Sequence, residues 1–412
     1  MDWRHVANLS LRPSLRVTLC PAPCPGLSPA LCAPDVPVDP PAPRRASGGR
    51  GRTMTGADTA RPGRPGAARP DTGPDPRPTG VRRAVRALLR PEPYRRGPVL
   101  TASALLLGLV MLLHAAIPNR IGNLGSLVET VLPWSGLFVP LLLAGALWRR
   151  SAGALVALLL PVSVWLNLFG GLLLDKSHPG GDLTVVSHNV GAGNPDPVRT
   201  ARALAASGAD VLALEEITSR AKPLYEGELA RTYRYRTVLG TVGLWSSLPL
   251  SDIRPVDVET DYGPLGDAKS EAVKLTYNRA LRATVTTARG PLAVYVAHLG
   301  SARVNPGAGF WTDARDRGAR ALGRAVAAER SGRVVLLGDL NGTLDDRAFA
   351  SVTSRLRSAQ EVAGDGFGLT WPAAFPLVRI DHVLVRGVTP RSSWSLPATG
   401  SDHLPVAATV SW

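Results

Sequence analysis

Val334-Val335-Leu336-Leu337-Gly338-Asp339-Leu340-Asn341 is an apolar run that ends in an acid and an amide. Short runs of β-branched and aliphatic residues are typical of buried β-strands. Other apolar runs also border on polar residues, namely His188-Asn189, Glu215-Glu216, His298, Asp381-His382 and Ser401-Asp402-His403. Because strand ends gather along the rim of a sheet, we expect these acids, amides and imidazoles to converge on one site.

The positive charge of the chain is concentrated upstream of Asp182. The 412 residues carry a formal net charge of +15, but residues 182–412 contain 26 Lys and Arg against 23 Asp and Glu, which leaves 21 against 9 upstream. A strongly basic domain is a common footprint of nucleic-acid binding. Here the basic charge belongs to the tail, so it is no argument that residues 182–412 bind nucleic acid.

Residues 1–96 are rich in Pro, Arg, Gly and Ala and show little apolar periodicity. Such a segment buries too little apolar surface to offset the entropy of ordering, so we expect a disordered tail. Cys20, Cys24 and Cys32 all lie in it without a His or acidic ligand pattern, and we expect no metal site there. We interpret Met54 as a candidate for the true start, which would leave the protein without cysteine.

Three apolar stretches without Asp, Glu, Lys or Arg follow, at 99–117, 131–148 and 152–174. A helix of about 20 apolar residues is long enough to cross the roughly 30 Å of hydrocarbon in a bilayer. We therefore expect three transmembrane helices within residues 97–176. The alternative, a set of core helices in a globular domain, is less consistent with three uncharged stretches in close succession.

The arginines predict how these helices are oriented. Arg149 and Arg150 lie between the second and third stretches, and residues 95–96 precede the first with the basic tail behind them, whereas Arg120 stands beside Glu129 in the remaining loop. Positive loops stay on the cytoplasmic side. We therefore expect a multi-pass protein of the cell membrane with a cytoplasmic N-terminus and residues 182–412 outside the cytoplasm.

Residues 182–412 alternate between strand and helix patterns and form one large unit. We expect strands at 183–188, 210–214, 234–238, 242–246, 271–276, 280–287, 291–299, 333–337, 380–385 and 406–411, and helices at 197–207, 219–230 and 310–329. This mixture indicates two sheets packed face to face with helices outside.

The order of these motifs resembles the endonuclease/exonuclease/phosphatase superfamily, which includes deoxyribonuclease I. The resemblance covers residues 182–412 and rests on Asn189, Leu214-Glu215-Glu216, Leu244-Trp245-Ser246-Ser247-Leu248-Pro249-Leu250, His298, Gly338-Asp339-Leu340-Asn341, Arg379-Ile380-Asp381-His382 and Ser401-Asp402-His403-Leu404-Pro405-Val406. It implies an α/β (α+β) domain built as a four-layer α/β/β/α sandwich. It also implies hydrolysis of phosphate esters with Mg²⁺, with Mn²⁺ or Ca²⁺ as alternatives.

The resemblance places Glu216 as the metal ligand, with Asn189 and Asp402 completing the inner or outer shell. Mg²⁺ takes one or two carboxylates and keeps several waters, which leaves room for phosphate oxygens. Glu215 replaces the family's usual Gln. This exchange brings an extra acid close to the metal unless strand alternation points it away.

His403 is the candidate general base, since an imidazole that titrates near neutrality can take a proton from water. By the resemblance, Asp381 fixes its tautomer, Asp339 aligns the attacking water or shares its proton, and Asn341 donates to a phosphate oxygen. His298 matches the histidine that stabilises or protonates the leaving side. The family's carboxylate partner of this histidine is missing before Leu244. The sequence therefore supports a position of His298 near the phosphate more than a role as general acid.

The substrate is open at the level of the sequence. We take a nuclease as the first interpretation, with a candidate basic groove at Arg303, Arg315, Arg317, Arg320 and Arg324, although the same arginines are also typical of a solvated helix face. The alternative is a phospholipase C-like, sphingomyelinase-like or inositol-phosphate phosphatase activity, for which residues 306–311 offer an apolar loop. A catalytically inactive binding module is a third reading, opposed by the complete set of motifs. We expect no protein partner.

Overall fold

The computed structural model describes residues 96–258 and 270–412. The expectations of a disordered tail and of a start at Met54 concern residues outside the described ones. The N-terminal part of the described chain is helical. Its elements are α3 (Pro98–Leu112), η2 (His114–Ala116), α4 (Leu124–Val131), η3 (Leu132–Leu137), α5 (Phe138–Trp148), α6 (Ala152–Ala157), α7 (Leu159–Phe169) and η4 (Gly170–Leu173).

Two helical segments of the described chain, Leu124–Trp148 and Ala152–Leu173, are long and apolar enough to cross a membrane. The expectation of three is wrong for the first stretch, because α3 ends at Leu112 after 15 residues. Beyond it the backbone tightens into η2, where the carbonyl of His114 accepts a hydrogen bond from Arg347 of the sheet domain. Only 11% and 28% of the apolar stretches in the two long segments are buried, so they are not core helices of a globular domain.

Residues 183–412 form two six-stranded sheets. The first sheet has the order β13-β14-β1-β2-β4-β3 and consists of β1 (Leu183–Asn189), β2 (Val211–Glu215), β3 (Tyr235–Leu239), β4 (Val242–Ser246), β13 (Thr389–Ser395) and β14 (Val406–Ser411). The second has the order β11-β12-β10-β7-β6-β5 and consists of β5 (Leu250–Pro255), β6 (Ala280–Thr287), β7 (Gly290–Ala297), β10 (Val334–Asp339), β11 (Arg357–Ser358) and β12 (Asp381–Arg386).

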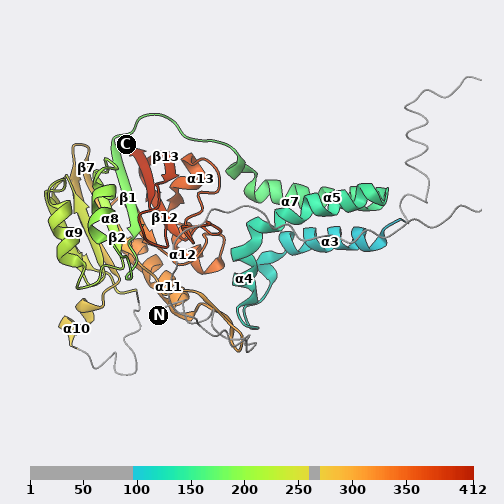
Figure 1. Ribbon diagram of the computed structural model, residues 1–412, viewed down its shortest axis with the longest axis horizontal. Helices are drawn as coiled ribbons and strands as arrows, with labels where there is room; N and C mark the ends of the chain where they lie inside the picture. The colour runs from blue at the N-terminus through green and yellow to red at the C-terminus, as the bar shows by residue number, and fades with distance from the viewer. Residues whose placement is uncertain (1–95, 259–269) are drawn as a thin grey trace, which may run out of the picture. The chain divides into compact units, whose positions relative to one another are not determined.

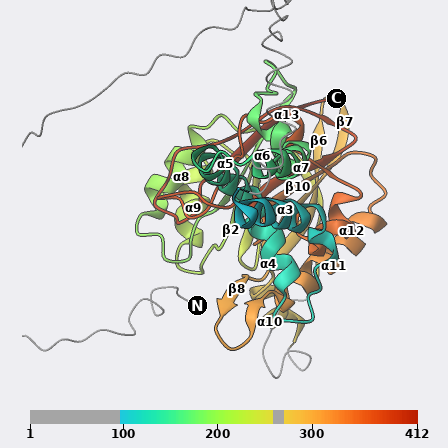
Figure 2. The ribbon, with the colours of Figure 1, turned by 90° about the vertical axis from the view of Figure 1, so that its right-hand side faces the viewer.

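The two sheets pack face to face through aliphatic side chains. Val185 and Val211 of the first sheet share one buried cluster with Val294 and Val335 of the second. Two helices, α8 (Pro197–Ala205) and α9 (Lys222–Leu229), cover the outer face of the first sheet, and α11 (Asp313–Ala328) and α12 (Ala350–Thr353) cover that of the second. Figure 1 shows the two sheets, and Figure 2 shows the helix pairs on opposite sides of them. The expected sandwich of two sheets is confirmed.

Several local predictions differ from the structure. The strand expected at 271–276 is a helix, α10 (Glu271–Thr276), which begins after Ser270 in extended conformation and ends near Lys274, a basic residue suited to a helix C-terminus. The helix expected from 310 begins at Asp313, because residues before it form the small hairpin of β8 (Arg303–Asn305) and β9 (Gly309–Trp311). The chain also contains α13 (Ala359–Ala363) and η6 (Arg347–Phe349).

Candidate active site

Polar side chains from both sheets meet at one edge of the sandwich. In the parallel pair of β1 and β2, Asn189 lies opposite Glu215, and in the antiparallel pair of β10 and β12, Asp339 lies opposite Asp381. The Nδ2 of Asn189 donates to Oδ2 of Asp339 at 2.9 Å, which joins the two sheets at this edge. His298 follows directly after β7, the parallel neighbour of β10. The strand ends therefore converge as the sequence predicts, but His188 and His382 project from the opposite faces of their strands, toward the hydroxyl of Thr399 and the carbonyl of Gly342.

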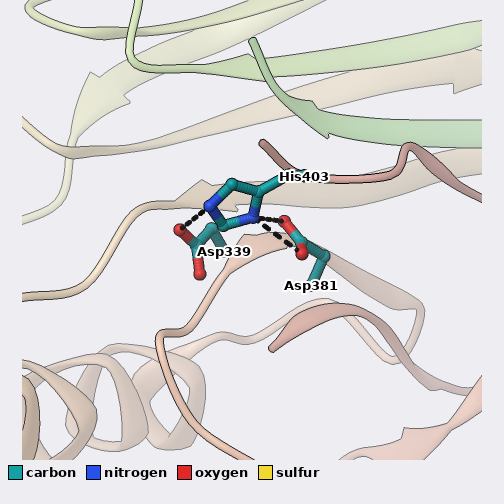
Figure 3. Close-up of side chains that lie close together, drawn as sticks. All are labelled: Asp339, Asp381 and His403. Atoms are coloured by element: carbon teal, nitrogen blue, oxygen red, sulfur yellow. Dashed lines mark hydrogen bonds and ion pairs between the residues drawn. The ribbon is translucent and has the colours of Figure 1, made fainter. Parts of the chain in front are cut away.

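His403 and Asp381 form a buried pair (Figure 3). The Nδ1 of His403 lies 3.1 Å and 3.0 Å from the two carboxylate oxygens of Asp381. A carboxylate accepts only, so Nδ1 carries the proton, and Nε2 is turned toward Oδ2 of Asp339 at 3.8 Å. The backbone of His403 donates to the hydroxyl of Ser401, which itself donates to the carbonyl of Asn189. These bonds hold the imidazole at the strand edge.

The charges of this cluster shift one another's pKa values. Burial disfavours the charged imidazole, but the carboxylates of Asp381 and Asp339 outweigh it and raise the pKa of His403 to about 10. Burial raises the pKa of Asp339 to about 7, with His403 opposing and Asp381 adding to the shift. Burial also acts to raise the pKa of Asp381, but its contact with His403 prevails and leaves that pKa below its usual value. The two carboxylates therefore stabilise the charged form of the imidazole that lies between them.

The loop after β10 is fixed by Asp339 itself. The Oδ1 of Asp339 accepts from the backbone N–H of Asn341 at 2.8 Å, and Asn341 adopts a left-handed conformation with φ 54°. The Nδ2 of Asn341 donates to the carbonyl of Leu299 at 3.0 Å and lies 3.2 Å from Oδ2 of Asp339. Asn341 therefore reaches the site, next to the residue that follows His298.

The residues expected to bind a metal lie around the same edge. Glu216 stands at φ 61° just past β2, where its Oε2 accepts from the backbone of Ala192 and its Oε1 lies 3.6 Å from Nε2 of His298. Oδ2 of Asp339 lies at the same distance from that nitrogen, so the carboxylates of Glu216 and Asp339 both lie next to His298. Hard oxygen donors of this kind fit Mg²⁺. The exposed Asp402 lies at the rim instead, where it accepts from Nε1 of Trp371 at 3.3 Å.

A second group of buried acids and imidazole also has the spacing of a metal site. Ligand atoms of Asp339, Asp381 and His403 all lie within 4.8 Å of one another. Because His403 and Asp381 bond to each other, and because Mg²⁺ prefers oxygen ligands, this group fits a proton-transfer pair better than a set of Mg²⁺ ligands. Glu215 is buried within the sandwich, bonded to Ser187, and burial raises its pKa well above the usual value. It lies on the same face of the first sheet as Asn189, where Asp381 and Asp339 add to the rise in its pKa.

Arg279 is a site residue that the sequence analysis missed. Its Nη2 lies 2.7 Å from Nε2 of His298, and its Nε and Nη2 also donate to the carbonyls of His298 and Leu299. Burial lowers the pKa of Arg279, while the nearby carboxylates of Asp339 and Glu216 act to raise it. Arg279 sits in no recognisable motif. Only the pairing of the strands around it could have found it, since the backbone of His298 donates to the carbonyl of Arg279.

The expected basic groove does not form on α11. Arg315 is fully buried and pairs with Asp316 and Asp346, so it serves the structure of the domain. Arg317 and Arg320 are exposed on the face of α11 that is turned away from the second sheet. The arginines of α11 therefore form an ordinary solvated face around a structural arginine.

Comparison with known proteins gives one family and several solved structures. The model of the Endonuclease/Exonuclease/phosphatase family matches residues 186–403. Similar structures include TDP2 from D. rerio complexed with a single-strand DNA product (19% identity, TM-score 0.45, 56% of this chain and 99% of that chain covered). Two others are beta toxin from Staphylococcus aureus with bound magnesium ions (15%, 0.40, 55% and 99%) and a mannosyl-6-phosphatase from Bacteroides thetaiotaomicron (15%, 0.45, 56% and 100%). No curated protein matches the chain.

Proposed function

The chain belongs to the endonuclease/exonuclease/phosphatase family, and we propose that it is a Mg²⁺-dependent phosphodiesterase in which His403 is the general base. The observation that carries the proposal is the buried pair of His403 and Asp381, in which Nε2 of the imidazole is turned toward Asp339. Water attacks phosphorus, its proton passes to Nε2, and the bond from phosphorus to the leaving oxygen breaks. The carboxylate of Asp381 accepts a hydrogen bond from the protonated Nδ1 of His403 and stabilises the imidazolium that forms.

Glu216 and Asp339 are the residues proposed to hold the metal, with Asn189 beside them. A bound Mg²⁺ supplies polarisation of the phosphoryl oxygens and of the attacking water. The pKa of His403 would fall from its raised value if the charge on Asp339 were offset by the cation, which would bring the imidazole toward its working range as a base. Arg279 provides a positive charge for the phosphate oxygens, and Asn341 and Asp402 line the loop and the rim.

We further propose that the protein is anchored in a membrane by its apolar helices, with the catalytic domain outside the cytoplasm. The exposed apolar surface of the two long segments supports the anchor, since large exposed apolar patches mark membrane or partner contact. The arginines at 149 and 150 support the orientation. With these arginines on the cytoplasmic side, the two long segments alone return the chain to the outer side of the membrane before the catalytic domain.

For the substrate, the placement of the site favours a phosphodiester headgroup at a membrane surface over a nucleic acid. A nuclease needs several Lys or Arg side chains along a groove, whereas on α11 Arg315 is buried in an ion pair, and Arg317 and Arg320 lie on the face turned away from the second sheet. The loop from Trp371 to Leu377 instead joins the rim to the helical part, because Trp371 donates to Asp402 and Trp134 of η3 donates to the carbonyl of Leu377 at 2.8 Å. Lipid headgroups would reach this rim.

The test uses the purified full chain with Mg²⁺ or with EDTA. Phosphatidylcholine and sphingomyelin vesicles, plasmid DNA, RNA and inositol phosphates are offered in parallel, and soluble phosphorylated product is measured. We expect Mg²⁺-dependent release of headgroup from vesicles. Faster cleavage of DNA or RNA than of lipid would identify a nucleic acid as the substrate. Hydrolysis that persists in EDTA would refute the metal-dependent mechanism.

A further inference from the structure

A cavity of about 140 Å³ lies between the helical part, residues 98–173, and the catalytic domain, residues 183–412. Its helical wall contains Thr130, Trp134 and Leu172, and its other wall contains Phe367, Leu377 and Arg379. It is separate from the candidate active site, because His382, which also lines it, projects from the opposite face of β12 to Asp381 and lies 2.9 Å from the carbonyl of Gly342. Strand β12 thus has the catalytic aspartate on one face and this cavity on the other.

Buried polar atoms without a partner are concentrated around this cavity. Among the described residues, Nε and Nη2 of Arg379, Oγ1 of Thr343, Oε1 of Gln360 and Nδ1 of His382 are shielded from solvent and have no hydrogen-bond partner. Buried polar groups in folded proteins are nearly always paired with protein, water or ligand. Four residues with unpaired polar atoms around one cavity therefore indicate that a ligand or water occupies it.

Arg379 determines which chemistry would fit. Its Nη1 is already used, because it donates to the carbonyl of Gly368 at 2.9 Å. The remaining Nε and Nη2 form the side-on edge of the guanidinium, and two parallel N–H donors match the two oxygens of a carboxylate or phosphate. Two acids, Asp345 and Glu361, also line the cavity, but both residues are exposed to solvent, so water screens their charges more than it screens the buried edge of Arg379.

The rest of the cavity is apolar and reaches the surface. Leu172 and Phe367 offer no partner to water, whereas an apolar cavity of about 150 Å³ can take up a molecule of the size of benzene. Trp134 and Leu377 are 36% and 38% exposed and are bonded to each other, so the cavity opens beside them at the end of the apolar helices. A ligand with an apolar chain could leave the cavity here along the helical surface.

We propose that this cavity binds an amphiphile with an oxyanion head and a single apolar chain. The carboxylate or phosphate head pairs with the free edge of Arg379, and the chain passes beside the bonded pair of Trp134 and Leu377 toward the helices. Such a ligand satisfies the buried donors and fills the apolar volume at the same time, which water or a free anion does only in part. The site is distinct from the proposed hydrolytic site, so the two can be tested apart.

The test measures binding to the full chain in phosphatidylcholine nanodiscs. Labelled oleate is the probe, oleyl alcohol has the same length of chain without the oxyanion, and inorganic phosphate has an oxyanion without the chain. We expect saturable binding of oleate, little competition from oleyl alcohol and little from phosphate. Arg379→Lys, which removes the two-donor edge, and Leu172→Trp, which fills the cavity from the helical wall, should each weaken oleate binding about tenfold or more.

Arg386→Lys is the matched control, because Arg386, at the end of β12, is a part-buried arginine like Arg379 but donates to carbonyls of Val326, Glu329 and Ser331. It should leave oleate binding unchanged. If inorganic phosphate competes with labelled oleate as strongly as unlabelled oleate does, the cavity binds free anions and the proposal of an amphiphilic ligand is wrong. Absence of saturable oleate binding, or binding unaffected by both Arg379→Lys and Leu172→Trp, would leave ordered water as the occupant and overturn the site itself. Neither result depends on hydrolysis.

Discussion

The contact between Glu129 and Arg347 should decide how firmly α4 is held to the catalytic domain. Glu129 is only 2% exposed, and its carboxylate accepts from the backbone N–H of Arg347, from Nε and from Nη2 at 2.7–3.0 Å. The Nη1 of Arg347 donates to the carbonyl of Ile117 and Nη2 to that of His114. Arg347→Gln removes the guanidinium that makes these hydrogen bonds. The buried carboxylate of Glu129 is then left with the backbone N–H of residue 347.

The expected cost follows from the burial of the two partners. Breaking a buried ion pair by removing one partner costs about 3 to 5 kcal/mol. The side chain of Arg347 is 32% exposed, so part of its charge is already screened by water and the lower end, about 3 kcal/mol, applies. A loss of this size corresponds to a fall of roughly 6 to 12 °C in the unfolding midpoint of a domain of this length.

The measurement is thermal unfolding of the detergent-solubilised full chain in a double-mutant cycle of Glu129→Gln, Arg347→Gln and both. The double variant should lose clearly less than the sum of the single losses, because it buries no unpaired charge. Arg355→Gln, at an exposed arginine of the same region, is the control and should stay within about 0.5 kcal/mol. If Arg347→Gln behaves like this control, or if the two single losses add, the pair does not hold α4 and the reasoning is wrong.

Further predictions concern the mechanism and the topology. His403→Ala should lower kcat by roughly 10²- to 10⁴-fold with an unchanged unfolding midpoint, since general-base catalysis contributes about that much; steady-state kinetics near the wild-type rate would exclude His403 as the base. Glu216→Gln should recover part of its lost activity in a titration to high Mg²⁺, because it weakens a ligand, whereas His403→Ala should not recover; equal behaviour of the two variants would contradict their separate roles. Mg²⁺ binding should release protons near neutral pH, because the pKa of Asp339, raised to about 7 by burial, falls when a cation binds; calorimetry in two buffers of different ionisation enthalpy checks this, and identical heats in both would refute it. An alkaline-phosphatase fusion after Asp175 should be active and a cytoplasmic reporter at the same position silent; the reverse pattern would refute the orientation.

The sequence predicted the convergence of the site because each functional group stands at the end of a strongly apolar strand. Asn189, Asp339 and Asp381 are fixed by strand registers that a period of two residues already indicates. The helix at 271–276 was missed because its six residues contain Val273 and Leu275 in alternation, which imitates a strand. Such a short segment is decided by its surroundings, which no local pattern encodes.

Contacts between distant segments could not be predicted in this way. Arg315 was assigned to a basic groove because it lies on a helix with other arginines, but its burial depends on Asp346, which is 31 residues away. The pairing of Glu129 with Arg347 spans 218 residues. Both ion pairs arise from the packing of one element on another, and the sequence offers only the charges, without their partners.

Arg279 changes the role that the sequence analysis gave to His298. Arginine has donors only, so its Nη2 at 2.7 Å from Nε2 of His298 requires Nε2 to be the acceptor and places the proton of the neutral ring on Nδ1. Burial, reinforced by the charges of Arg279 and His403, lowers the pKa of His298 well below its usual value. A neutral imidazole without a proton on Nε2 cannot protonate a leaving oxygen from that nitrogen. We therefore infer that the positive charge at this side of the site is the guanidinium of Arg279, which His298 orients toward Glu216 and Asp339.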